Sequence, residues 1–167
     1  MESAGDFRNL RWGMAKADVL ALEPRWRADG DHTTGEEELF GIPFDIRAEI
    51  GPVGLTAVHY QLRGALGPPA GYWAVMDAIA GALCAWFGPA ELDELALSGD
   101  STRSGERGRR AVRAGDGAWV KQWSVGGRTR VRLTLQRGME DVDKNEPLAI
   151  HISYAALPRV MPGGAGG

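Results

Sequence analysis

Histidine and acidic side chains, which often serve in catalysis and metal binding, are scattered along this chain. The three histidines, His32, His59 and His151, are far apart and lack the spacing of a metal-ligand motif such as HExxH. Asp29-Gly30-Asp31-His32 could hold a cation weakly, but a solvated acidic loop explains it better. Glu36-Glu37-Glu38 is more typical of a charged approach to a strand than of a catalytic carboxylate pair.

Motifs that would identify an enzyme are also missing from the sequence. It contains no GxSxG elbow, phosphate-binding loop or dinucleotide fingerprint. The single cysteine, Cys84, excludes an internal disulfide and is expected to be an inert buried thiol. We therefore predict no catalytic residues, no metal and no cofactor, although scattered residues can still assemble an active site.

Positive charge is concentrated in one stretch of the chain. Residues 101–137 contain 10 basic and 2 acidic side chains, a net charge of +8. The rest contains 9 basic and 20 acidic side chains, a net charge of −11, and the whole chain carries −3. A localised positive field attracts anionic surfaces even when the whole protein is negative. Five arginines of this stretch are candidate contacts to such a surface: Arg103, Arg107, Arg109, Arg110 and Arg113.

The length of 167 residues fits one domain, which we place at residues 1–157, followed by a flexible Gly/Pro-rich tail at 158–167. The N-terminus is polar and acidic and shows no secretory or lipid-attachment signal, so we expect a cytoplasmic protein.

Residues 69–90 approach membrane-spanning length, but Asp77 and the many small residues oppose insertion. We therefore predict no membrane association.

The apolar pattern predicts a two-layer α+β sandwich, with an antiparallel sheet of about five strands packed by one long helix plus a short N-terminal helix. Period-two alternation predicts strands at 39–50, 55–63, 118–125, 128–136 and 148–154. The short helix covers 15–22, and the long helix begins at Pro68-Pro69 and ends at Gly88-Pro89. Residues 28–37 are predicted to be a polar loop and 99–117 a long Arg-rich connection. No internal repeat is convincing.

The long helix has two contrasting sides. One side carries a strong apolar stripe at helical spacing: Tyr72, Val75, Met76, Ile79, Leu83, Trp86 and Phe87. The other side carries small residues where a solvated helix would have charges: Ala74, Ala78, Gly81, Ala82 and Ala85. Either the domain covers both sides of the helix, or the small-residue side docks a second helix and forms a homo-oligomer.

A hairpin centred on Gly126-Gly127 is the clearest local signal. A two-residue loop sets Val125 opposite Arg128, and this register gives one face tryptophan and basic side chains. The candidate partner-binding residues on that face are Trp119, Lys121, Trp123, Arg128, Arg130 and Arg132. We expect this face to point outward, with Trp123 opposite Arg130, together with His59, His151 and the row Asp45, Arg47 and Glu49. The arginine stems either shield the tryptophans from water or form a binding surface with them.

Several motifs resemble a known group of proteins. They are Phe7-x-x-Leu10-x-Trp12-Gly13-Met14 before a short helix, Trp86-Phe87-Gly88-Pro89 at the end of the long helix, and Ile152-Ser153-Tyr154 in the last strand. Together they resemble small bacterial domains with the β-lactamase-inhibitor-protein-like and outer-membrane-assembly-lipoprotein-like fold. The resemblance implies a non-enzymatic protein binder that uses the outer face of its sheet. The absence of a lipid-bearing cysteine in this sequence is a departure from the lipoproteins.

The predicted function is therefore a non-enzymatic protein-binding module, of the adaptor, inhibitor or immunity type, whose partner has an acidic surface. The alternative is a nucleic-acid-associated accessory protein that uses the Arg-rich residues 103–137.

Overall fold

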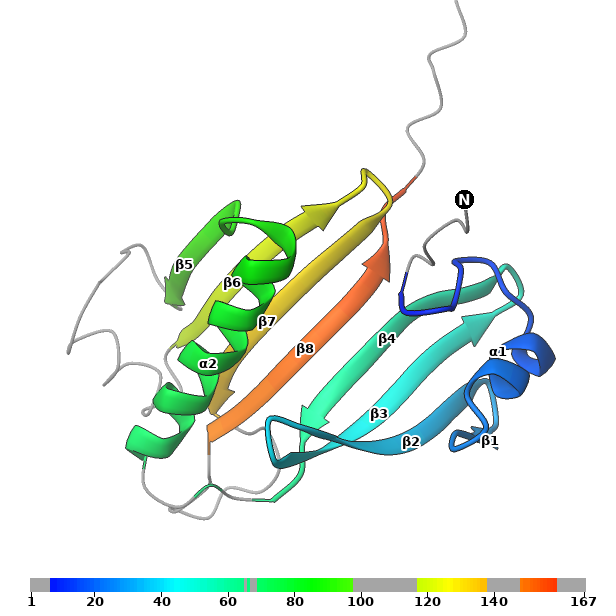
Figure 1. The fold of residues 1–167 in the computed structure, drawn as a ribbon, viewed down its shortest axis with the longest axis horizontal. Coiled ribbons are helices and arrows are strands. Elements are labelled where there is room, and N and C mark those ends of the chain that lie inside the picture. Colours follow the sequence, from blue (N-terminus) through cyan, green and yellow to red (C-terminus); the bar gives the residue numbers. More distant parts are fainter. Residues whose placement is uncertain (1–6, 65, 67–68, 98–116, 138–147, 159–167) are drawn as a thin grey trace, which may run out of the picture.

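One antiparallel sheet forms most of the structure, a computed structural model that describes residues 7–64, 66, 69–97, 117–137 and 148–158. The helices within these residues are α1 (Lys16–Leu22) and α2 (Pro69–Phe87). The strands are β1 (Arg27–Asp29), β2 (His32–Leu39), β3 (Ile42–Gly51), β4 (Gly54–Leu62), β5 (Leu92–Leu97), β6 (Gly117–Val125), β7 (Thr129–Arg137) and β8 (Leu148–Ala156). Their order across the sheet is β1-β2-β3-β4-β8-β7-β6-β5 (Figure 1).

The predicted fold, a sheet of about five strands packed by one long helix plus a short N-terminal helix, is wrong in its main element. The described part of the chain forms a sheet of eight strands, and the two helices are minor parts of the structure. The five predicted strands correspond to β3, β4, β6, β7 and β8. The missed strands β1 and β2 lie at one end of the sheet, and β5, where Leu92, Leu95 and Leu97 indicated either a short strand or a turn, lies at the other. Strands at a sheet end bury fewer side chains, so their sequences lack the alternation that identifies a strand.

The order of elements repeats once along the chain. In each half, a helix precedes four antiparallel strands that follow one another in the sheet, first α1 with β1–β4 and then α2 with β5–β8. The last strands of the two halves, β4 and β8, pair antiparallel at the centre. A half-turn about an axis through this pair therefore takes one four-stranded unit onto the other. The repeat that the sequence did not reveal is present in the topology.

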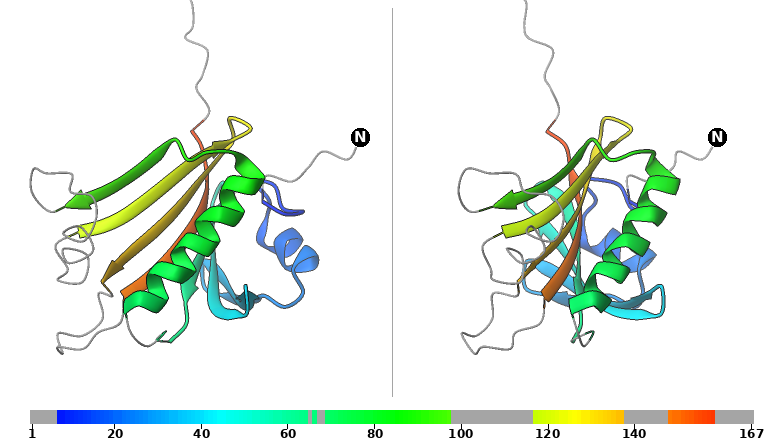
Figure 2. Two further views of the ribbon diagram at one scale, coloured as in Figure 1. Left: turned by 60° about the vertical axis from the view of Figure 1, so that its left-hand side comes forward. Right: turned by 90° about the vertical axis from the view of Figure 1, so that its left-hand side faces the viewer.

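Both helices lie on the same face of the sheet, which we call the inner face (Figure 2). On this face α2 packs against β6, β7 and β8, and α1 packs against β4. Trp26 covers Gly35 of β2 so closely that a Cβ atom on Gly35 would lie 2.5 Å from the indole. The largest fully buried side chains include Leu10, Phe44, Ile46, Leu55, Tyr72, Met76, Ile79, Leu83, Trp123, Leu133, Leu135 and Ile150. One continuous core therefore lies between the sheet and the elements on its inner face.

The N-terminal segment before α1 is fixed to both halves of the sheet. The Gly13 amide donates to the Leu55 carbonyl and the Leu55 amide donates to the Met14 carbonyl, each at 2.9 Å. The Trp12 Nε1–H donates to the Thr129 hydroxyl at the start of β7, also at 2.9 Å. These bonds hold the segment across β4 and β7. Together with the short helix α1, the segment therefore covers the inner face of the sheet.

The predicted ends of α2 are confirmed. Pro69 is its first residue, and Gly88 follows its last residue with a φ of +85° and donates its amide to the Cys84 carbonyl. Most of the apolar stripe faces the sheet, but Trp86 is 67% exposed. The small-residue side is exposed at Ala74, Ala78, Gly81 and Ala85. The prediction that the domain itself covers this side is therefore wrong, and oligomer formation through it stays a prediction.

Candidate functional site

The β6–β7 hairpin has a different register from the predicted one. Val125 pairs with Thr129, not with Arg128, so the loop contains three residues, Gly126, Gly127 and Arg128. Trp123 consequently pairs with Val131, and its predicted pairing with Arg130 is wrong. A shift of one residue exchanges the two faces of a strand. The tryptophans and the β7 arginines therefore lie on opposite faces of the sheet.

The tryptophans of β6 belong to the inner face. Trp123 is 1% exposed, lies beneath α2, and donates its Nε1–H to the Gly88 carbonyl at 3.0 Å. Trp119 donates to Asp93 Oδ1 at 2.7 Å, and Lys121 pairs with Asp93 Oδ2 at 3.1 Å. Burial opposes ionisation of Asp93, but these two hydrogen bonds outweigh it and hold the pKa of the carboxyl below its usual range. Trp119, Lys121 and Trp123 therefore stabilise the hairpin from its inner side.

The remaining predicted contacts divide into two groups. Arg130 and Arg132 are exposed on the face opposite the helices, and Arg128 is exposed in the hairpin loop. The five arginines of the Arg-rich connection, Arg103, Arg107, Arg109, Arg110 and Arg113, lie outside the described residues. Of the predicted partner-binding set, Arg130 and Arg132 are the two that reach the sheet surface opposite α2.

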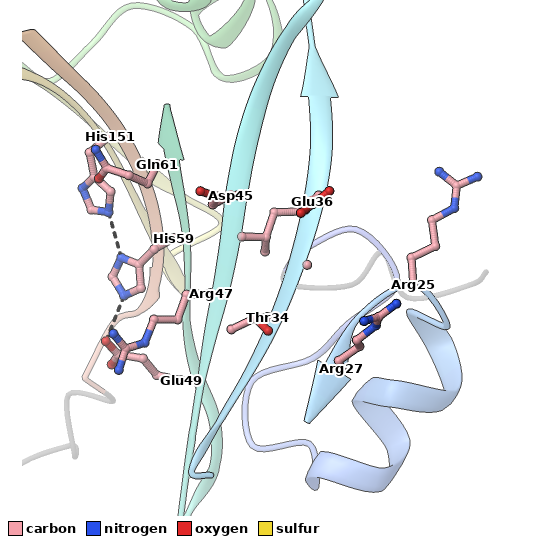
Figure 3. A pocket seen from close by; sticks show the side chains of 12 residues that line it. Arg25, Arg27, Thr34, Glu36, Asp45, Arg47, Glu49, His59, Gln61 and His151 are labelled. Atoms are coloured by element: carbon pink, nitrogen blue, oxygen red, sulfur yellow. Dashed lines mark hydrogen bonds and ion pairs between the residues drawn. The ribbon is translucent and has the colours of Figure 1, made fainter. Parts of the chain in front are cut away.

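That surface, which we call the open face, contains a broad polar hollow. The hollow has a volume of about 1060 Å³ and extends over β1, β2, β3, β4 and β8 (Figure 3). Its lining residues are Arg25, Arg27, Thr34, Gly35, Glu36, Asp45, Ile46, Arg47, Glu49, His59, Gln61 and His151. The prediction that His59, His151, Asp45, Arg47 and Glu49 share one face is confirmed. A hollow that spans five neighbouring strands, each about 4.8 Å apart, has the dimensions of a macromolecular contact.

A pair of histidines lies at the centre of the sheet, on the floor of this hollow. His59 Nδ1 and His151 Nε2 are 3.1 Å apart, and the two rings are stacked at an interplanar angle of 13°. His59 Nε2 lies 3.0 Å from Glu49 Oε1. A carboxylate only accepts, so a neutral His59 donates from Nε2 to Glu49 and accepts at Nδ1 from the Nε2–H of His151. The three side chains form one chain of hydrogen bonds.

The histidine pair is also the clearest trace of the repeat in the sequence. Tyr60 pairs with Ile152 across the central strands, and each histidine directly precedes one of these residues. Ala57-Val58-His59 in β4 therefore corresponds to Ala149-Ile150-His151 in β8. The sequence similarity of these tripeptides was the signal that could have placed the two histidines together.

The chemistry of this cluster does not resemble a metal centre. Within the residues that the structure describes, no group of three histidine, cysteine or acidic side chains is arranged to hold a metal ion. In the cluster itself, both ring nitrogens of His59 already have polar neighbours at hydrogen-bond distance. The arrangement suits a hydrogen-bonded surface group better than a ligand set.

The ion pairs of the described open face leave several of its arginines unused. Arg63 pairs with both Glu36 and Asp45, and His59 contacts Glu49. Five arginines on this face have no ion-pair partner among the described residues: Arg25, Arg27, Arg47, Arg130 and Arg132. Arg63 brings one positive charge to the two carboxylates that it pairs with, so the hollow keeps negative as well as positive groups, and the five arginines can meet anionic groups of a partner.

Comparison with known proteins gave no match to a protein-family model, a curated protein or a solved structure. The resemblance to β-lactamase-inhibitor-like and lipoprotein-like domains therefore stays a prediction. Neither described helix combines the length and hydropathy needed to cross a membrane.

The histidine pair predicts a specific pH dependence. Burial, the neighbouring His59 and the positive charge of Arg132 lower the pKa of His151 from its usual 6.5 to about 4. The unfolded chain therefore takes up a proton at His151 before the folded protein does as the pH falls below 6.5. This lowers the free energy of unfolding between these two values by about 1–2 kcal/mol, after allowance for solvent screening.

His151→Gln tests this dependence, because glutamine keeps a polar side chain without titrating. Urea denaturation of both proteins at about pH 7 and about pH 4.5 gives the two stability differences. The variant should lose less stability on acidification than the wild type, whereas equal losses would show that His151 is protonated alike in the folded and unfolded states.

Proposed function

We propose that this protein is a non-enzymatic protein-binding module of the adaptor, inhibitor or immunity type, and that it binds its partner on the open face. The observation that supports this most is that the described elements outside the sheet lie on one of its faces. Both described helices and the N-terminal segment lie on the inner face, while the opposite face of the same sheet presents a hollow of about 1060 Å³ (Figures 2 and 3). A sheet needs only one buried face for its stability, so the second face is available for recognition.

The expected partner is a protein with an acidic surface. The arginines of the open face that lack ion-pair partners in the described structure lie on both sides of the histidine pair, with Arg25, Arg27 and Arg47 on one side and Arg130 and Arg132 on the other. Arginine presents several donors in a planar group and is common among residues that dominate interface energetics. Carboxylates on the partner would meet these arginines at both sides of the hollow.

A nucleic acid is the less favoured partner, because acids interrupt the positive surface. Glu36, Asp45 and Glu49 lie in the hollow between the two groups of arginines. A phosphate backbone that crossed the face from one group to the other would pass these carboxylates, and like charges repel. A protein surface can instead place basic groups against them.

The proposal is tested by reversing charge on the open face. Arg130→Glu/Arg132→Glu changes the net charge by −4, and Arg11→Glu/Lys16→Glu makes the same change on the N-terminal segment and the first residue of α1. The partner is first captured from the native host with the wild-type protein, identified, and purified. We expect the open-face variant to bind it at least about 30-fold more weakly by calorimetry, and the control variant to bind within about threefold of wild type.

Two results would overturn the proposal. Equal binding by both variants would remove the open face from the interface. Retention of a nucleic acid instead of a protein, with an affinity that falls steeply as salt is raised, would favour the nucleic-acid alternative.

A further inference from the structure

A second concave site lies on the inner face, away from the open face. It is a groove of about 600 Å³ between the C-terminal half of α2, the β2–β3 turn and the N-terminal segment, with β4, β8 and β7 as its floor. Six of its lining residues are aromatic: Phe7, Phe40, Tyr60, Trp86, Phe87 and Tyr154. Small-molecule sites are typically concave and apolar, contain a few polar groups, and have volumes of about 300–1,000 Å³.

The mouth of the groove carries two large exposed aromatic side chains. Trp86 is 67% exposed on α2, and Phe40 is 54% exposed in the turn between β2 and β3. Large apolar groups in contact with water at one site are typical of a binding surface. In this protein they belong to two separate elements that border the same groove.

The backbone at Phe40 is an independent indication that its side chain has a use. Phe40 has a φ of +55° and is followed by Gly41 with a φ of +74°. These values define a two-residue turn in which asparagine or glycine is favoured at both positions, and a bulky side chain is strained there. Phenylalanine at this position costs stability and is exposed, so folding alone does not explain it. Such strain is often found where a side chain contacts a ligand.

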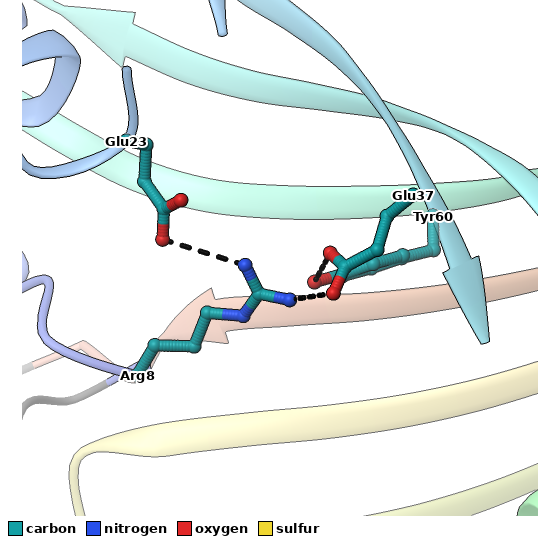
Figure 4. Close-up of polar contacts among 4 residues, drawn as sticks. All are labelled: Arg8, Glu23, Glu37 and Tyr60. Carbon is teal, nitrogen blue, oxygen red and sulfur yellow. Dashed lines mark hydrogen bonds and ion pairs between the residues drawn. The ribbon is translucent and has the colours of Figure 1, made fainter. Parts of the chain in front are cut away.

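The arginine beside the groove is already paired. Arg8 bonds to Glu23 on one side and to Glu37 on the other, and the Tyr60 hydroxyl donates to Glu37 Oε2 at 3.3 Å (Figure 4). The guanidinium is therefore already held by two carboxylates, and an anionic ligand gains no free cation from it. Glu38 also lines the groove, but it is exposed, and an ion pair of a cationic ligand with a solvated carboxylate contributes little.

Tyr154 lines the groove and carries a hydroxyl group. Among the described residues it has no hydrogen-bond partner, although its ring packs against Phe7 with the centroids 4.7 Å apart. A tyrosine hydroxyl is protonated at neutral pH and can donate, and burial raises the pKa of Tyr154 further, to about 12.

We propose that this groove binds a neutral amphipathic small molecule, with its apolar body between Trp86 and Phe40 and a hydroxyl or carbonyl oxygen at Tyr154. The site is separate from the open face, which lies on the other side of the sheet. The proposal therefore does not depend on the proposed protein-binding function.

Calorimetric titration with 1-octanol, octanoate and octylammonium, all below their aggregation concentrations, tests the choice of ligand. The three probes share one chain and differ in the charge of the head group. We expect 1-octanol to bind saturably and about tenfold or more tightly than either charged probe. Absence of saturable binding by 1-octanol, or tighter binding of a charged probe, would overturn the proposal.

Variants then test where 1-octanol binds. Ala82→Phe adds a ring within the groove and should weaken 1-octanol binding about tenfold or more, whereas Ala78→Phe, on the exposed side of α2, should leave it unchanged. Tyr154→Phe removes the hydroxyl alone and should weaken binding about two- to tenfold. Unchanged binding in Ala82→Phe would place the probe elsewhere. If sedimentation instead shows a dimer in which Trp86 is buried, the groove is occupied by a second copy of the chain and the proposal is refuted.

Discussion

Replacing Trp123 by alanine is expected to lower the free energy of unfolding by about 3–5 kcal/mol. The side chain is 1% exposed between β6 and α2, so its removal leaves a large cavity. It also removes the donor to the Gly88 carbonyl at the C-terminal end of α2, a hydrogen bond of 3.0 Å. Urea denaturation followed by circular dichroism measures the loss, since the far-ultraviolet signal reports on the sheet and on α2 together.

Trp86→Ala is the matched control, because it removes the same side chain from an exposed position on α2. Trp86 is 67% exposed, and surface substitutions usually change stability by within about 0.5 kcal/mol. A similar small loss for Trp123→Ala would mean that Trp123 lies on the surface, as the sequence-based register predicts, and that the hairpin is shifted by one residue.

The register of this hairpin shows what a local motif can and cannot predict. Gly126-Gly127 correctly predicted a tight turn between two strands, and both glycines have a positive φ. The loop, however, also includes Arg128, whose amide bonds to the Val125 carbonyl. Two-residue and three-residue loops are both compatible with adjacent glycines, and they place opposite faces inward. Which of the two loop lengths forms depends on the burial of Trp123 beneath α2, which is a tertiary contact.

The missed strand β2 has a similar cause. Its inward positions include Thr33, Gly35 and Glu37, which give no apolar alternation. The apolar cover comes from a different segment, since Trp26 lies directly over Gly35, and Glu37 is buried in part because it bonds to Arg8 and Tyr60. A strand whose core contacts are supplied by distant residues cannot be recognised from its own sequence.

The open face could be predicted in part. Alternation in β3, β4 and β8 placed Arg47, His59 and His151 on one side correctly, because their neighbours along each strand are strongly apolar. The contact between the two histidines was not predicted, because it requires β4 and β8 to be neighbours and the similarity of their tripeptides was the one sequence signal of that pairing. In the sequence, α2, β5, β6 and β7 lie between these two strands, and their pairing follows from the repeat in the topology.

Gly54→Ala is expected to destabilise the protein by about 2–4 kcal/mol, because it separates the N-terminal segment from the sheet. Gly54 has a φ of +87°, and a Cβ atom there would lie 2.2 Å from the carbonyl oxygen of Gly13. The obstructing atoms belong to the backbone, so a side-chain rotation cannot relieve the clash. The nearby hydrogen bonds of Leu55 to Gly13 and Met14, each 2.9 Å, would have to lengthen.

Gly51→Ala isolates this contact from general effects on the β3–β4 turn. Gly51 pairs with Gly54, but a Cβ atom on Gly51 would have no neighbour within 4 Å, and its φ lies outside the left-handed region. The control should therefore change the free energy of unfolding by less than about 1 kcal/mol. Hydrogen exchange at the Gly13 and Leu55 amides gives the local readout: both should exchange faster in Gly54→Ala and at the wild-type rate in Gly51→Ala. If both variants lose stability equally without a change at these amides, the turn determines the loss, and the close approach of Gly13 to Gly54 does not hold the segment in place.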